Sequence, residues 1–145
     1  MKTKTLLSLT VALCAAAFVH AAQLVGGPAG GRLLETEPAR TEFVVNAERK
    51  AEIRFYDAAL KPAAPTTQVV AVTAEPASGR AKLEVVRTEF GFVTTDALPA
   101  GEPYRVVVQV RATPEAKPQN FRIDLNLGHC AGCDRAEYAC TCESH

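Results

Sequence analysis

The stretch YRVVVQVR, residues 104–111, decides the fold. Its tyrosine and every second residue after it, all of them valines, fall on one side, and its arginines and glutamine fall on the other. The stretch QNFRIDLNL, residues 119–127, repeats the alternation with phenylalanine, isoleucine and two leucines against polar neighbours. Successive side chains of a strand point to opposite faces. Each stretch therefore predicts a strand with one buried face and one solvent-exposed face, as is common in antiparallel sheets.

Shorter stretches of the same kind lie towards the N-terminus. They cover residues 32–35, 42–45, 51–56, 68–73, 82–87 and 90–94. Turn-forming residues separate them, with prolines and glycines in 57–62, 75–80 and 114–118. Helical periodicity is confined to about one turn within 134–139. Two sheets packed face to face would bury all of these apolar stripes. We therefore expect an all-β protein, an Ig-like antiparallel β-sandwich with a short irregular C-terminal tail rich in Cys and His.

The N-terminus has the features of a secretory signal peptide, residues 1–21. A basic start is followed by an apolar run, residues 6–19, and then by small residues in VHAA, residues 19–22. The run is shorter than the roughly 20 residues that span a membrane. We expect cleavage near Ala22, a periplasmic or secreted protein, and no membrane anchor after cleavage. Cys14 lies in the signal and follows a leucine, which argues against a lipoprotein.

The mature chain of about 124 residues fits one domain. Its predicted parts are a flexible Gly-rich arm, residues 22–31, a β-sandwich, residues 32–127, and a tail, residues 128–145. Without the signal it carries 14 basic and 16 acidic residues, and the basic ones are scattered. Nucleic acids and anionic membranes are bound by clustered positive charge. We therefore expect neither as a partner.

An enzymatic function is not expected. The predicted sandwich contains no histidine, no cysteine and no Gly-rich phosphate loop. Ser78 has no evident base to activate it, as a nucleophilic serine requires.

The tail carries the candidate chemistry, in the pattern His-Cys-x₂-Cys-x₆-Cys-x-Cys-x₂-His. The predicted metal ligands are Cys130, Cys133, Cys140 and Cys142, with His129 and His145 as secondary ligands. Four thiolates suit a tetrahedral site, and soft thiolates select Cu(I) or Zn(II). The Cys-x-Cys pair is less usual for a single zinc ion, which favours copper. Tyr138 is expected to be a packing anchor that folds the tail against itself.

The alternative is a tail closed by two disulfides, Cys130–Cys142 and Cys133–Cys140, since exported proteins meet oxidising conditions. The protein would then be a non-metal Ig-like interaction module. The flanking histidines favour metal, because a disulfide has no use for them. Covalent haem is excluded because Asp134 stands where a histidine is needed, and a thioredoxin-like site is disfavoured by the absence of a βαβ pattern.

Several motifs carry a resemblance. They are PAGGRLL (28–34), ERK (48–50) leading into IRF (53–55), and YACTC (138–142). With them the chain resembles small exported bacterial proteins associated with heavy-metal efflux of the resistance-nodulation-division type. The resemblance implies buffering or delivery of a metal, with an envelope efflux adaptor as partner. LPAGEPY (98–104) also resembles a turn that feeds a late strand in small bacterial Ig-like export domains.

Overall fold

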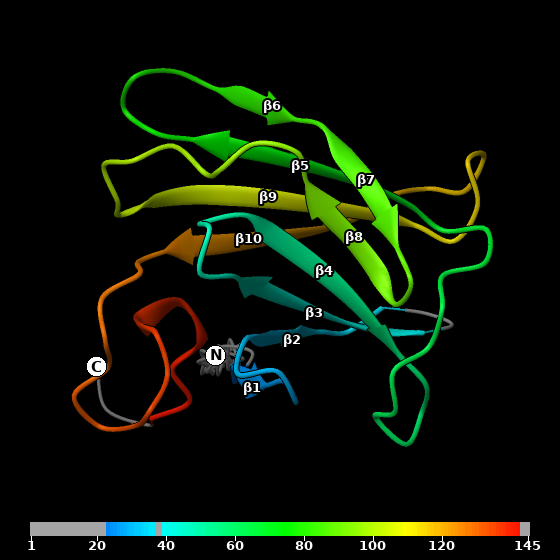
Figure 1. Cartoon of the computed structure of the whole chain (residues 1–145), viewed down its shortest axis with the longest axis horizontal. Coiled ribbons are helices and arrows are strands. Elements are labelled where there is room, and N and C mark those ends of the chain that lie inside the picture. The colour runs from blue at the N-terminus through cyan, green and yellow to red at the C-terminus, as the bar shows by residue number, and fades with distance from the viewer. Residues whose placement is uncertain (1–22, 37–38, 143–145) are drawn as a thin grey trace, which may run out of the picture.

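A computed structural model of the chain describes residues 23–36 and 39–142, and it contains two antiparallel sheets packed together (Figure 1). The six-stranded sheet has the order β1-β2-β3-β4-β8-β7, and the four-stranded sheet has the order β10-β9-β5-β6. The strands are β1 (Val25–Gly26), β2 (Arg32–Leu34), β3 (Arg40–Val45), β4 (Ala51–Tyr56), β5 (Val69–Glu75), β6 (Ala81–Leu83), β7 (Val85–Thr88), β8 (Gly91–Thr94), β9 (Tyr104–Arg111) and β10 (Gln119–Leu125). The predicted β-sandwich is confirmed.

The strand order is that of an immunoglobulin-type sandwich. Strands β3, β4, β8 and β7 take the places of A, B, E and D, and β5, β9 and β10 take those of C, F and G. Tyr104 opens β9, and its hydroxyl donates a 2.7 Å hydrogen bond to the carbonyl oxygen of Pro99. This is the tyrosine corner that commonly fixes the start of strand F in such folds. The turn-like stretch 98–104 therefore has a structural role.

The predicted strand 82–87 is two strands that belong to different sheets. Residues up to Leu83 pair with β5, and residues from Val85 pair with β8. Leu83 and Val85 both face inward, so the alternation of side chains continues while the chain crosses from one sheet to the other. The pattern alone could not show the break at Glu84.

The core lies between the sheets and follows the predicted alternation. On β9 the side chains of Tyr104, Val106, Val108 and Val110 are buried, as are Ile123 and Leu125 on β10. The facing sheet contributes Phe43, Ala51, Ile53 and Phe55, each at most 1% exposed. Burial on this scale is the main stabilising contribution to such a fold.

The prediction of a flexible Gly-rich arm is wrong for the described residues from Gln23 on. Val25 and Gly26 form β1, which pairs with β2, and the Gly27 amide donates to the Gly31 carbonyl at 2.9 Å. The chain thus makes a tight hairpin whose second strand, β2, pairs with β3 in the same sheet.

A buried carboxylate explains why this hairpin is ordered. Glu42 on β3 is fully buried, and it accepts hydrogen bonds from the amides of Ala29 (3.1 Å) and Gly31 (2.7 Å) and from the Tyr56 hydroxyl (2.6 Å). Buried charges persist in proteins when such donors surround them. A Cβ on Gly27 would lie 2.1 Å from the Glu42 side chain, so the close approach requires glycine.

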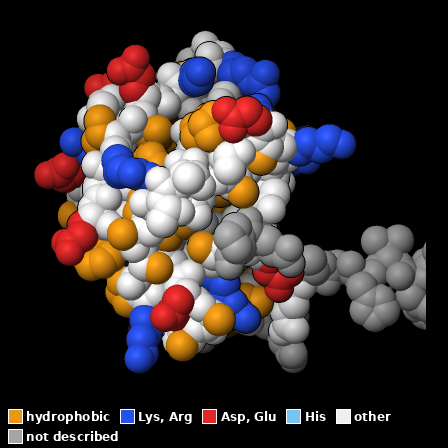
Figure 2. Space-filling view, turned by 90° about the vertical axis from the view of Figure 1, so that its right-hand side faces the viewer, with side chains coloured by type: hydrophobic (Ala, Val, Ile, Leu, Met, Phe, Trp, Pro, Cys, Tyr) orange, Lys and Arg blue, Asp and Glu red, His pale blue; other side chains and the backbone are white. Residues whose placement is uncertain are grey.

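Figure 2 shows the end of the sandwich that lies on the right-hand side of Figure 1. Side chains of both charges lie there among hydrophobic ones. Within the part of the chain that is described, no helix has the length and apolar character needed to cross a membrane. The predicted signal peptide lies outside the described residues.

Candidate metal centre

After β10 the chain leaves the sheet and folds back as a loop beside β1 and β2 (Figure 1). Its two arms are joined by backbone hydrogen bonds, from Cys130 N to Arg135 O (2.9 Å) and from Glu137 N to Gly128 O (2.8 Å). A single 3₁₀ turn, η1 (Glu137–Ala139), follows, within the range where about one helical turn was expected. We call residues 128–142 the cysteine loop.

Tyr138 fastens the cysteine loop to the sandwich. Its ring packs edge-on against Phe43 with centroids 5.5 Å apart, and its hydroxyl accepts a 3.0 Å hydrogen bond from the Val45 amide. Its own amide donates to the carbonyl oxygen of Asn126 at 3.1 Å. Tyr138 is an anchor, as expected, but it holds the loop to the sandwich rather than to itself.

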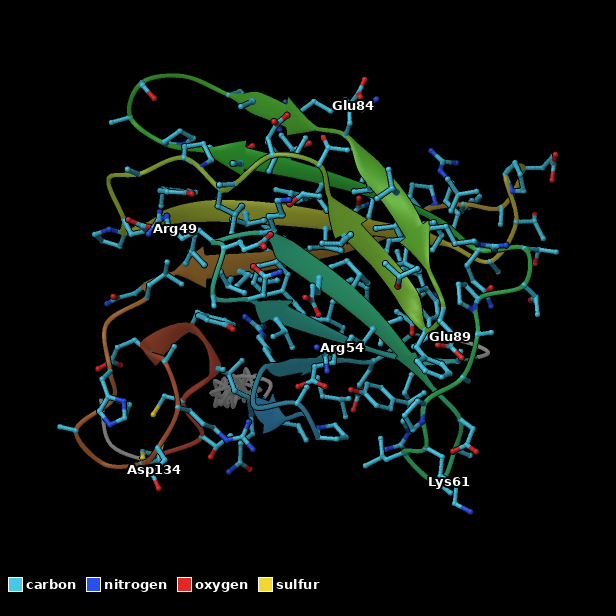
Figure 3. All side chains as sticks on the ribbon, in the orientation of Figure 1. Arg49, Arg54, Lys61, Glu84, Glu89 and Asp134 are labelled. Atoms are coloured by element: carbon cyan, nitrogen blue, oxygen red, sulfur yellow. The ribbon has the colours of Figure 1, made fainter. Side chains whose placement is uncertain are left out.

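The four cysteine sulfurs meet at one point of this loop. All of them lie within 4.8 Å of one another, and Figure 3 shows the sulfurs in the loop with Asp134 at its outer end. The Sγ atom of Cys130 is 3.9 Å from that of Cys142 and 2.8 Å from that of Cys140. The Sγ atoms of Cys133 and Cys140 are 3.8 Å apart. The predicted clustering of the four cysteines is confirmed.

These distances suit one four-coordinate ion. A zinc ion bound at about 2.3 Å by four sulfurs separates them by about 3.8 Å. The contacts of Cys130 with Cys142 and of Cys133 with Cys140 already have this length. The Sγ atoms of Cys130 and Cys140 would have to part by about 1 Å to complete the tetrahedron.

Two sulfurs face the protein and two face solvent. Cys130 and Cys140 are 2% and 3% exposed, whereas Cys133 and Cys142 are half-buried. A hydrogen bond from the Cys140 thiol, helped by the Gly132 amide, lowers the pKa of Cys130 to about 6. The same hydrogen bond raises the pKa of Cys140, the proton donor, to about 12. The two sulfurs therefore share a proton, and the pair loses its first proton more readily than a free cysteine does.

The Cys-x₂-Cys turn depends on Gly132. A Cβ at this position would lie 2.8 Å from the Sγ atom of Cys142, closer than real Cβ atoms approach. The amide of Cys142 donates to the Cys140 sulfur at 3.4 Å. Two backbone amides thus donate to sulfurs, that of Cys142 to Cys140 and that of Gly132 to Cys130, and such hydrogen bonds favour the thiolate form that a metal requires.

Comparison with protein-family models, curated proteins and solved structures finds no match for this chain. The resemblance to efflux-associated proteins therefore stays a prediction that rests on the motifs alone.

The structure brings the four predicted cysteine ligands together but does not place the predicted histidine ligands with them. His129 is exposed, bridges to Ala136 through its backbone, and is not part of the group of clustered ligand atoms. His145 lies outside the described residues. The four sulfurs are not bonded to one another, and the closest pair, Cys130 and Cys140, belongs to neither of the disulfides considered above.

Arg135 is a residue of the site that sequence reasoning missed. Its guanidinium contacts the carbonyl oxygens of Gly27 and Gly31, more than a hundred positions earlier in the chain. No local pattern marks such a partner, because the contact exists only once the hairpin and the cysteine loop lie side by side.

Proposed function

We propose that this protein binds one soft metal ion through Cys130, Cys133, Cys140 and Cys142 and carries it outside the cytosol. The observation that supports the proposal is the convergence of four cysteine sulfurs within 4.8 Å of one another. Thiolates are the preferred ligands of soft ions. The site is one of binding and exchange, and it needs no catalytic group.

Zn(II) is the ion that the geometry favours, and Cu(I) is its competitor. Zinc takes four thiolates in a tetrahedron, and two of the sulfur contacts already have the required length. The sequence favours copper through its Cys-x-Cys pair. A competition titration with both ions decides between them.

A carrier must release its ion, and the partial exposure of two ligands offers a route. Cys133 and Cys142 are half-buried, so a thiolate of an acceptor could reach the metal from their side. Cys130 and Cys140, which are buried, would hold the ion until transfer. An envelope efflux adaptor is the acceptor that the sequence resemblance favours.

The test is metal uptake by the reduced protein, purified without oxygen. We expect one equivalent of Zn(II) or Cu(I) to bind tightly, and a variant with all four cysteines of the loop changed to serine to bind none. Elemental analysis after gel filtration measures the stoichiometry. Equal uptake by the two proteins would refute the proposal, and intact disulfides without metal in protein isolated from its native compartment would favour the interaction module.

The affinity is expected to depend on pH in two regimes. Binding must displace the protons that Cys140 and Cys142 retain in the neutral range, because the pKa of each of these thiols is raised. Below pH about 6 Cys130 is protonated as well, so binding displaces one more proton. Because protons compete with the metal, affinity should fall with falling pH, and below about pH 6 by about a further tenfold per unit. Competition with a chelator of known proton affinity, from pH 5 to 8, measures this; an unchanged slope across pH 6 would contradict it.

A further inference from the structure

Arg135 joins the cysteine loop to the N-terminal hairpin. It lies between Cys133 and Cys140, and its backbone carbonyl accepts the hydrogen bond from Cys130 N. Its Nη1 atom lies 3.1 Å from the Gly31 carbonyl oxygen, and its Nη2 atom lies 3.4 Å from that of Gly27. One residue therefore contacts a metal-ligand segment through its backbone and the hairpin through its side chain.

The hairpin turn, residues 27–31, is held from two sides. The amides of Ala29 and Gly31 donate to the buried carboxylate of Glu42, and the carbonyls of Gly27 and Gly31 accept from Arg135. The negative group thus faces the N–H ends of the turn, and the positive group faces its C=O ends. Hydrogen bonds with an ionised partner are about twice as strong as neutral ones.

Two glycines keep this arrangement open. A Cβ on Gly27 would lie 2.1 Å from Glu42, and a Cβ on Gly26 would lie 2.6 Å from Cζ of Arg135. The glycines of the N-terminal segment therefore allow the turn to fit between a carboxylate and a guanidinium.

We propose that Arg135 is a positioning residue for the metal centre, and that it couples metal binding to the order of residues 25–31. The inference rests on the proposed function. A metal ion held by Cys133 and Cys140 fixes the chain on both sides of Arg135, and thereby fixes its guanidinium against the two carbonyls. Coupling of this kind is reciprocal, so the docked hairpin also holds the loop in its metal-binding shape.

The first measurement is the Zn(II) affinity of reduced wild-type protein and of variants, by competition with a chromophoric chelator. Loss of a group that orients metal ligands commonly lowers affinity by about 10- to 100-fold. We expect Arg135→Ala to bind Zn(II) about tenfold more weakly. Gly26→Ala displaces the guanidinium and leaves the loop sequence intact, so it should weaken binding in the same direction. Arg80→Ala is the matched control, because Arg80 is exposed and pairs with Glu75 in a distant turn.

The second measurement is hydrogen exchange at the amides of Ala29 and Gly31, which a merely structural arginine would not link to metal. Zn(II) is expected to slow this exchange in the wild type and not in Arg135→Ala. Thermal unfolding with chelator present shows whether each variant folds. If Arg135→Ala fails to fold, Gly26→Ala carries the test.

The outcomes separate the two proposals. A wild type that binds no Zn(II) or Cu(I) would end the proposed function. A wild type that binds Zn(II), together with folded variants whose affinity is within twofold of it, would overturn the role of Arg135. Exchange at Gly31 that is indifferent to Zn(II) would overturn the coupling.

Discussion

Cys140→Ser is expected to weaken Zn(II) binding by about a hundredfold or more. The Cys140 sulfur contacts two others of the group, at 2.8 Å from that of Cys130 and 3.8 Å from that of Cys133. A serine hydroxyl stays protonated and is a poor ligand for soft ions. A four-ligand zinc site contributes about 10–16 kcal/mol, so one ligand accounts for roughly a quarter of this, and each 1.4 kcal/mol is tenfold in affinity. Chelator competition at constant pH measures the loss.

His129→Ala is the matched control, and it also tests the sequence prediction that this histidine is a ligand. His129 is exposed and outside the sulfur group. Removing its side chain should therefore leave the Zn(II) affinity within about twofold of the wild-type value. If His129→Ala weakened binding as much as Cys140→Ser, the ion would sit elsewhere in the loop, and the four-sulfur centre would be wrong.

The strands could be predicted because their signal is local. Side chains on β9 and β10 alternate along the chain, and the structure buries the predicted faces. The change of sheet at Glu84 could not be predicted, because it leaves this local alternation unbroken. Leu83 and Val85 each point into the space between the sheets, one from each side, so the alternation that locates a strand cannot say which sheet it joins.

The ordered hairpin could not be predicted because its partners are distant in sequence. Glycines and a proline without apolar alternation are typical of a flexible segment. Here the same glycines allow the backbone to approach Glu42 on one side and Arg135 on the other. A lone glutamate in an alternating strand is ordinarily assigned to the solvent face. Glu42 does point away from the sandwich core, but the hairpin covers it.

The cysteine site was predictable in its composition and less so in its setting. Close spacing of Cys130 with Cys133 and of Cys140 with Cys142 limits how far each pair can separate, which favours a cluster. Spacing does not reveal that the loop is docked. The docking depends on the aromatic contact of Tyr138 with Phe43, two residues that are far apart in the sequence.

Tyr138→Ala is expected to lower the free energy of unfolding by about 3–5 kcal/mol, the usual cost of removing a large buried aromatic side chain. Tyr138 is 6% exposed, and its ring meets Phe43, which is fully buried. The change also leaves the Val45 amide without its acceptor. Domains of this size have about 5–15 kcal/mol of stability in all. Urea unfolding of the reduced protein, with chelator present to remove metal, measures the loss.

Two further variants separate the contributions. Tyr138→Phe keeps the ring and loses only the hydroxyl, so it should cost about 1 kcal/mol. Phe90→Ala removes an aromatic ring that is 42% exposed, and a surface change of this kind should cost about 0.5 kcal/mol. If Tyr138→Ala unfolded at the same urea concentration as the wild type, the cysteine loop would not be part of the folded core. In that case the contact of Tyr138 with the sandwich would not be what places Cys140 beside Cys130. The metal ion itself would then have to bring the sulfurs together.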